Sequence, residues 1–261
     1  AFARRGIHYG WAVAAVTFLT MLVTAGAVGA PGVLLLPLQK EFGWATSEIS
    51  SALAIRLLLF GLMAPFAAAF MNRFGVRPVA IVALGMIAAS IIGSFFMTQL
   101  WQLVLLWGIV LGFGTGLTAM VLGATVATRW FVHRRGLVVG LLTASTATGQ
   151  LVFLPLLAAL TEQVGWRAAM TFVLGMIALA AVGVLALMRD RPVDVGLAPY
   201  GATQIVPAPA QPASLGAMLA SPLVALRDAA KTSTFWILFG TFFVCGASTN
   251  GLVQTHFVAL C

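Results

Sequence analysis

Long apolar stretches separated by short charged breaks are the dominant pattern along the chain. Six of them follow one another and a seventh comes after an interval, at 11–36, 48–71, 78–97, 101–128, 136–160, 167–188 and 235–258. A helix of about 20 apolar residues is long enough to cross the roughly 30 Å hydrocarbon core of a bilayer. The pattern therefore predicts an all-α, polytopic membrane protein in which a bundle of six helices is followed by a seventh helix.

The interval before the seventh stretch is rich in Pro, Ala and polar residues, as in "VPAPAQPAS". Such a composition is typical of a linker, and "ASPLVALRDAAKTSTFW" after it is expected to form a short interfacial helix that leads into the seventh stretch. We therefore predict a six-helix membrane bundle over residues 1–188 and a cytoplasmic linker over 189–233. Residues 234–261 are then helix 7, the start of a second bundle that is truncated here.

The composition agrees with a membrane protein, because 61% of the residues are hydrophobic and only 8% are charged. The net charge of +8 does not indicate nucleic-acid binding, since the basic residues lie in the breaks between apolar stretches and not on one solvated face. One set of alternate breaks holds only Lys40 and Arg167. The other set holds eleven basic residues, Arg4, Arg5, Arg73, Arg77, Arg129, Arg134, Arg135, Arg189, Arg191, Arg227 and Lys231. Because Lys and Arg accumulate on the cytoplasmic side, the N-terminus is predicted to be cytoplasmic.

Motifs for enzyme chemistry are absent from the sequence. It contains no GxSxG elbow, no HExxH pair and no phosphate-binding glycine loop, and its three histidines lie in different loops or helix ends. The two cysteines, Cys245 and Cys261, do not have the spacing of metal ligands. We therefore predict no catalytic residue, no metal site and no cofactor.

An arginine, Arg56, lies inside the second apolar stretch, in "LAIRLLLF". Inserting such a charge at the centre of a membrane helix costs about 2.5 to 3.5 kcal/mol, so an intramembrane arginine is a candidate functional residue. Two interpretations remain open: the guanidinium extends outward to the headgroups, or it faces a central cavity and binds a carboxylate through its planar fork. Glu48, eight residues earlier, is expected in the first turn of the helix, where a carboxylate is favourable.

Polar residues also occur at helical spacing in two other stretches. Thr143, Thr146 and Gln150 share one face of the fifth stretch, and Asn250 and Gln254 share one face of the seventh. We take Thr146, Gln150, Asn250 and Gln254 as candidate substrate contacts, although bonds to their own backbone or between helices would also explain them. His256, near the predicted outer end of the seventh stretch, is a candidate proton-coupling residue or a solvated histidine.

The break after the second stretch, "AAAFMNRFGVRP", resembles the signature loop of the major facilitator superfamily. Arg73, Gly75 and Arg77 match that signature, whereas Ala68 and Asn72 stand where the family has a glycine and an aspartate. In the family this loop is a cytoplasmic clamp between two halves of the protein. The resemblance therefore implies a conformational clamp formed by Asn72, Arg73, Gly75 and Arg77, and the alternative is a simple positively charged turn.

Further stretches are similar to the monocarboxylate transporter and oxalate/formate antiporter group of that superfamily, and the match is closer to the bacterial branch. They are, in chain order, "YGW", "EFGWATSEIS", "GFGTG", "RWFVHRRGLVVGL", "VGWRAAM" and "RPVDVGLAPYG". The resemblance implies a twelve-helix fold with two six-helix bundles around a central cavity. This chain would be the N-terminal half plus helix 7, in a bacterial-type inner membrane.

The implied function is secondary active transport of small, monocarboxylate-like organic anions by alternating access, coupled to protons or to a counter-anion. The partners would be the organic anion, the lipid bilayer and the missing C-terminal half of the same chain, and Arg56 is the leading candidate for contact with the anion. Two alternatives remain: a facilitator of a neutral or cationic solute, and a membrane sensor or scaffold that does not transport. The isolated 261 residues are expected not to catalyse transport.

Overall fold

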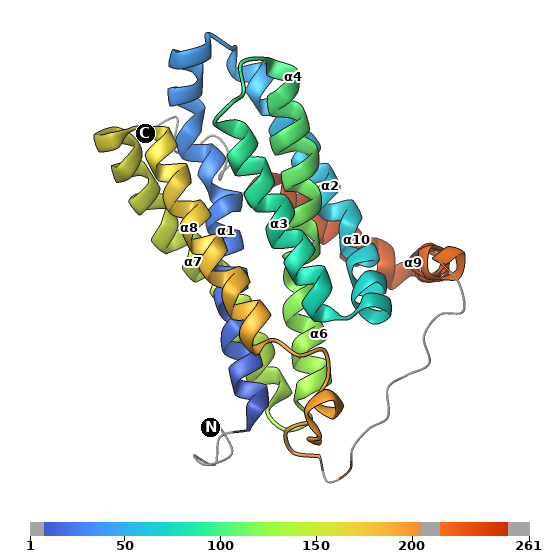
Figure 1. Ribbon diagram of the computed structural model, residues 1–261. Coiled ribbons are helices and arrows are strands. Elements are labelled where there is room, and N and C mark those ends of the chain that lie inside the picture. The colour runs from blue at the N-terminus through green and yellow to red at the C-terminus, as the bar shows by residue number, and fades with distance from the viewer. Residues whose placement is uncertain (1–7, 203, 205–214, 250–261) are drawn as a thin grey trace.

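The computed structural model describes residues 8–202, 204 and 215–249. In this part of the chain, six helical spans lie side by side (Figure 1) and are long and apolar enough to cross a membrane. They are α1 (Tyr9–Phe42), α2 (Thr46–Phe74), α3 (Val76–Ser94), a composite span (Leu100–Trp130), α7 (Arg135–Val164) and α8 (Trp166–Leu187). Each contains one of the first six apolar stretches or coincides with most of it. The prediction of an all-α, six-helix membrane bundle is confirmed.

The fourth span is not one regular helix. It consists of α4 (Leu100–Leu103), the π-helix η2 (Val104–Val110), α5 (Leu111–Thr118) and α6 (Met120–Trp130). Between α5 and α6 the backbone of Ala119 is extended, with φ −63° and ψ −162°. Sharp breaks in helices usually coincide with Pro, Gly or a π-turn, and Ala119 is itself neither Pro nor Gly. The sequence therefore carries no local signal for this break.

Close packing of the helices depends on glycine at two interfaces. α1 packs mainly against α7 and α8, and α2 packs mainly against α5 and η2. A Cβ atom on Gly149 of α7 would lie 2.4 Å from the carbonyl oxygen of Leu22 in α1, and one on Gly112 of α5 would lie 3.3 Å from the backbone of Arg56. Small residues let helix backbones approach closely in a membrane, where van der Waals contact drives association.

Side chains tie the helices together at both ends of the bundle. At the end where the described chain begins, the Tyr9 hydroxyl donates a hydrogen bond of 2.6 Å to the Leu187 carbonyl oxygen of α8. At the opposite end, Glu41 of α1 forms an ion pair of 2.6 Å with Arg167 of α8 and accepts a hydrogen bond of 2.5 Å from the indole of Trp166. The two contacts of Glu41 join the segments "EFGWATSEIS" and "VGWRAAM", which lie far apart in the sequence.

The first part of the predicted linker packs on the bundle. After the short 3-10 helix η3 (Pro192–Val195), Tyr200 forms a single β-bridge with Phe131, in which its N–H donates to the Trp130 carbonyl oxygen at 2.8 Å. The segment predicted to form a short helix contains α9 (Leu215–Ala229), which packs against α2, and its position at the membrane interface stays a prediction.

The described part of the seventh stretch is α10 (Ser233–Gly246), and its axis is bent by 103° from that of α9. The boundaries of the three segments proposed from the sequence remain predictions.

Candidate functional site

A cavity of about 220 Å³ lies among α1, α2, α5, α6 and α7. Three of the residues proposed from the sequence, Arg56, Thr146 and Gln150, lie in its wall although they come from two helices. The complete lining is Met21, Thr24, Ala25, Val28, Arg56, Leu57, Phe60, Thr115, Thr118, Ala119, Met120, Thr146 and Gln150. The sequence does not reveal this grouping, because it depends on how α2 and α7 are rotated about their axes.

Arg56 is buried in the bundle, with 7% of its surface exposed. It lies ten residues after Thr46, the first residue of α2, which places it about 15 Å along the helix. Its Nη1 donates a hydrogen bond of 3.0 Å to the Val28 carbonyl oxygen of α1. No carboxylate of the described chain lies within 4.0 Å of its guanidinium, since the ion pairs found there involve only Arg167 and Lys231. The side chain therefore points into the bundle and carries a buried charge that has no carboxylate counter-ion among the described residues.

The threonine hydroxyls of the cavity wall are already engaged as donors. Thr146 donates to the Thr143 carbonyl oxygen at 2.7 Å. Thr24, Thr115 and Thr118 likewise donate to carbonyl oxygens of their own helices at 2.8, 2.7 and 3.1 Å. This is the local bonding that threonine adopts in membrane helices. These hydroxyls therefore do not supply free donors for an anion.

The other polar residues singled out in the sequence include some that the structure does not describe. Thr143 contributes its carbonyl oxygen to Thr146 and does not line the wall. Asn250, Gln254 and His256 lie outside the described residues. The expectation for Glu48 is confirmed: it is in the first turn of α2, where its Oε2 accepts a 2.8 Å hydrogen bond from the backbone N–H of Ala45.

The sequence reasoning missed the contribution of the fourth span. Thr115, Thr118 and Ala119 all lie in the cavity wall. The three-residue spacing of the two threonines within "GFGTGLTAM" was the available signal, since it places both hydroxyls near one helix face. Ala119 gave no signal, because its role comes from the extended backbone at the break and not from its side chain.

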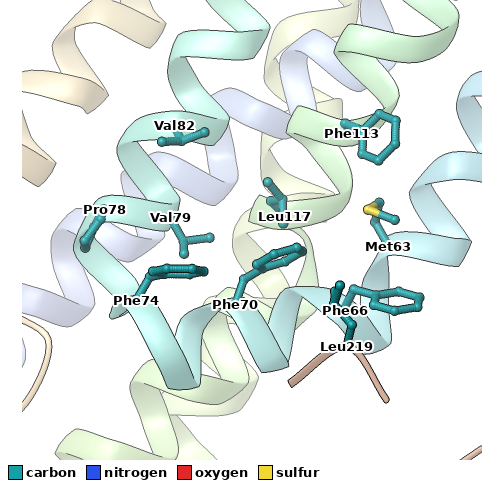
Figure 2. A pocket seen from close by; sticks show the side chains of 10 residues that line it. All are labelled: Met63, Phe66, Phe70, Phe74, Pro78, Val79, Val82, Phe113, Leu117 and Leu219. Atoms are coloured by element: carbon teal, nitrogen blue, oxygen red, sulfur yellow. The ribbon is translucent and has the colours of Figure 1, made fainter. Parts of the chain in front are cut away.

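A second and larger cavity of about 590 Å³ lies on the side of the bundle where α9 meets α2 (Figure 2). It contains no polar or charged side chain that would recognise an ion. Its lining is Met63, Phe66, Phe70, Phe74, Pro78, Val79, Val82, Phe113, Leu117 and Leu219. We therefore place the candidate solute site in the smaller cavity that contains Arg56.

The proposed clamp residues lie at the turn between α2 and α3. The Asn72 side-chain oxygen accepts a 2.8 Å hydrogen bond from Arg129 Nη2 of α6, which also bonds the Met71 carbonyl oxygen at 2.9 Å. Asn72 thus takes the acceptor role that an aspartate would have, without the charge. In the described chain, this contact joins two helices of the same bundle.

Gly75 and Arg77 form the second part of this turn. Gly75 has φ +97°, and a Cβ there would lie 2.5 Å from the Asp190 carboxylate. That carboxylate accepts a 2.7 Å hydrogen bond from the backbone N–H of Arg77, whose Nη2 donates to the Leu185 carbonyl oxygen at 2.6 Å. Arg73 lies over the ring of Phe74 at 5.8 Å. The turn is therefore tied to the end of α8 as well as to α6, and a role as a clamp between two halves remains a proposal.

We expect Asn72→Asp to stabilise this end of the bundle modestly. The new carboxylate would form an ion pair with Arg129 in place of a neutral hydrogen bond, worth about 0.5 kcal/mol at an exposed position. The midpoint of thermal unfolding in detergent should rise by roughly 1 to 2 °C. The same change in an Arg129→Gln background serves as the control, and an equal rise there would show that the pair is not the cause.

Comparison with known proteins identifies the family. The model of the Major Facilitator Superfamily matches residues 16–259. Monocarboxylate transporter 7 of Homo sapiens is 28% identical over 181 residues, which is 69% of this chain and 34% of that protein. Monocarboxylate transporter 9 of Gallus gallus is 30% identical over 181 residues, covering 69% and 35%. Monocarboxylate transporter 11 of Homo sapiens is 31% identical over 172 residues, covering 66% and 36%.

The chain spans about a third of the length of these curated relatives. The family model, in contrast, extends over more than half of the chain, from two turns into α1 to beyond α10. The six apolar spans and the matched sequence agree with one another. The chain is a multi-pass membrane protein that belongs to the major facilitator superfamily.

Proposed function

We propose that this protein is a secondary active transporter of small organic anions of the monocarboxylate class. The observation that carries the proposal is Arg56, a buried guanidinium in a cavity wall with no protein carboxylate within 4.0 Å in the described chain. The names of the relatives, monocarboxylate transporters of vertebrates, support the same substrate class. Membership in the family supports transport, and the activity, the substrate and its coupling all belong to this proposal.

The physical basis is the cost of an unpaired charge away from water. A guanidinium remains protonated at any physiological pH and presents a planar fork of donors that matches a carboxylate. A substrate carboxylate would supply the missing counter-charge and hydrogen bonds of the charge-assisted kind. Met21, Leu57 and Phe60 form an apolar part of the same wall, suited to a short hydrocarbon tail. A small monocarboxylate combines these two features.

The proposed mechanism is alternating access around this cavity. Substrate sites of such transporters lie near the bilayer midplane between two structural repeats, and rocking of one repeat against the other exposes the site to each side in turn. We place the N-terminus in the cytoplasm on the basis of the eleven basic residues in one set of breaks. The bacterial-type inner membrane is proposed from the resemblance of the sequence motifs to the bacterial branch of the family. Coupling is to protons or to a counter-anion, and the second half of the fold would complete the site.

The test is uptake by the full-length protein in proteoliposomes. We expect saturable uptake of labelled acetate, L-lactate or pyruvate, increased by an imposed pH gradient or by a carboxylate preloaded inside the vesicles. A neutral sugar and a monoamine of similar size serve as control solutes. Uptake of either control solute without uptake of any carboxylate would contradict the proposal and favour the facilitator of a neutral or cationic solute. Carboxylate binding without flux would favour a sensor.

A further inference from the structure

The break at Ala119 places the start of a helix in the wall of the Arg56 cavity. Thr118, Ala119 and Met120 all line that cavity, and α6 begins at Met120. The helix is 11 residues long, which is three turns. Its first turn therefore faces the same space as the buried arginine, and not a loop at the membrane surface.

No side chain caps this helix start. Ala119 is the N-cap residue, and it has no side-chain oxygen that accepts from the first turn. The first N–H groups of any α-helix lack the usual acceptors within the helix. In α6 the Leu122 N–H donates to the Ala119 carbonyl oxygen at 3.0 Å, so the groups that concern us are the N–H groups of Met120 and Val121. Together with the helix dipole, they form a site that favours a negative charge. At the starts of α1 and α2, the His8 ring accepts from the Gly10 N–H and the Glu48 carboxylate accepts from the Ala45 N–H, whereas α3, α7 and α8 also start without a side-chain cap.

The buried arginine is an independent indication that an anion occupies this space. Arg56 has only 7% of its surface exposed, and its one hydrogen-bond partner in the described chain is the Val28 carbonyl oxygen. That bond uses one of the five N–H groups of a guanidinium. The threonine hydroxyls nearby donate to their own helices, so they neither neutralise the charge nor compete for an anion.

We infer that the substrate carboxylate is held from two sides, by the guanidinium of Arg56 and by the uncapped backbone N–H groups at the start of α6. The inference rests on the proposed function and adds the second contact. The ligand class is a small anion with a compact carboxylate, because both sets of donors must be reached within a cavity of about 220 Å³. The break in the fourth span is then a binding element, and its backbone is what recognises the charge.

Met120→Pro tests the backbone contact directly. Proline is favourable at the first position of a helix, where its fixed φ fits and its missing N–H costs no helix bond. The extended backbone of Ala119 also suits the residue before a proline. In full-length protein in proteoliposomes, we expect the half-saturation concentration for L-lactate to rise about tenfold more for Met120→Pro than for Met120→Ala. The alanine variant loses the same side chain and keeps the N–H.

A second pair of variants keeps the test valid if the proline prevents folding. Ala119→Asp places a carboxylate at the N-cap, where it satisfies the helix start and Arg56 in place of the substrate. Ala119→Asn has nearly the same shape without the charge. We expect lactate uptake to fall at least tenfold further in Ala119→Asp than in Ala119→Asn.

The outcomes separate this inference from the proposed function. Equal half-saturation values for the two Met120 variants, or equal uptake by the two Ala119 variants, would overturn the role of the helix start while wild-type lactate uptake still supports the proposed function. A wild-type protein that moves none of the carboxylates would overturn both.

Discussion

Saturable carboxylate uptake by the full-length protein is expected to fall roughly 10- to 150-fold when Arg56 is replaced by glutamine. A hydrogen bond to a charged group contributes about 1.5 to 3 kcal/mol, which corresponds to that range of affinity. Glutamine retains a donor that reaches toward the Val28 carbonyl oxygen but removes the charge and the planar fork. The measurement is the concentration dependence of labelled L-lactate uptake in proteoliposomes.

The stability of the same variant should change in a different way. Arg56 is buried without a counter-ion in the described chain, so removing its charge relieves an unfavourable burial and is expected not to lower the thermal unfolding midpoint. Arg227→Gln, at an exposed position on α9, is the matched control for loss of one positive charge. Normal uptake by Arg56→Gln would make Arg56 a structural residue. Unfolding of Arg56→Gln together with loss of uptake would also point to a structural role.

Gly149→Ala is expected to destabilise the bundle by about 1 to 3 kcal/mol, as overpacking in a close-packed interior does. The new Cβ would lie 2.4 Å from the Leu22 carbonyl oxygen and 3.0 Å from the Ala25 Cβ, so α1 and α7 would have to separate. These two helices form the most extensive interface in the described chain. We expect the midpoint of thermal unfolding in detergent, followed by tryptophan fluorescence, to fall by roughly 3 to 10 °C.

Gly140→Ala is the matched control because it makes the same chemical change in the same helix. A Cβ on Gly140 would meet no atom within 4 Å. Alanine also has the higher helix propensity, so this variant should be as stable as the wild type or slightly more stable. Equal destabilisation by the two substitutions would show that close contact between α1 and α7 is not what requires Gly149.

Much of the architecture was predictable because a bilayer restricts the backbone conformations that a chain can adopt. Backbone groups in hydrocarbon must bond within their own segment, so each long apolar stretch becomes a helix. The predicted stretches 136–160 and 167–188 correspond closely to α7 and α8. The break at Ala119 was not predictable in this way, since its extended backbone has neither a proline nor a glycine at that position to mark it.

The candidate site was only partly predictable from the sequence. Arg56 was identified as a candidate site residue because placing a charged side chain inside a membrane helix costs free energy. The sequence nevertheless left two directions open for the Arg56 side chain, toward the headgroups or toward a central cavity. The hydrogen bond to the Val28 carbonyl oxygen shows that the side chain points into the bundle. Thr146 and Gln150 share a face of their helix, but only the rotation of α7 brings that face to the cavity.

The sequence by itself determined that this chain lies in a membrane, that its first part forms six helices, and that one of them carries an arginine within its apolar stretch. Apolar length and the position of charged residues are local properties, and they suffice for these conclusions. Only the tertiary structure decided that Arg56 and the start of α6 share one cavity. That grouping depends on the rotation and close approach of helices distant in sequence, which packing at residues such as Gly112 and Gly149 establishes.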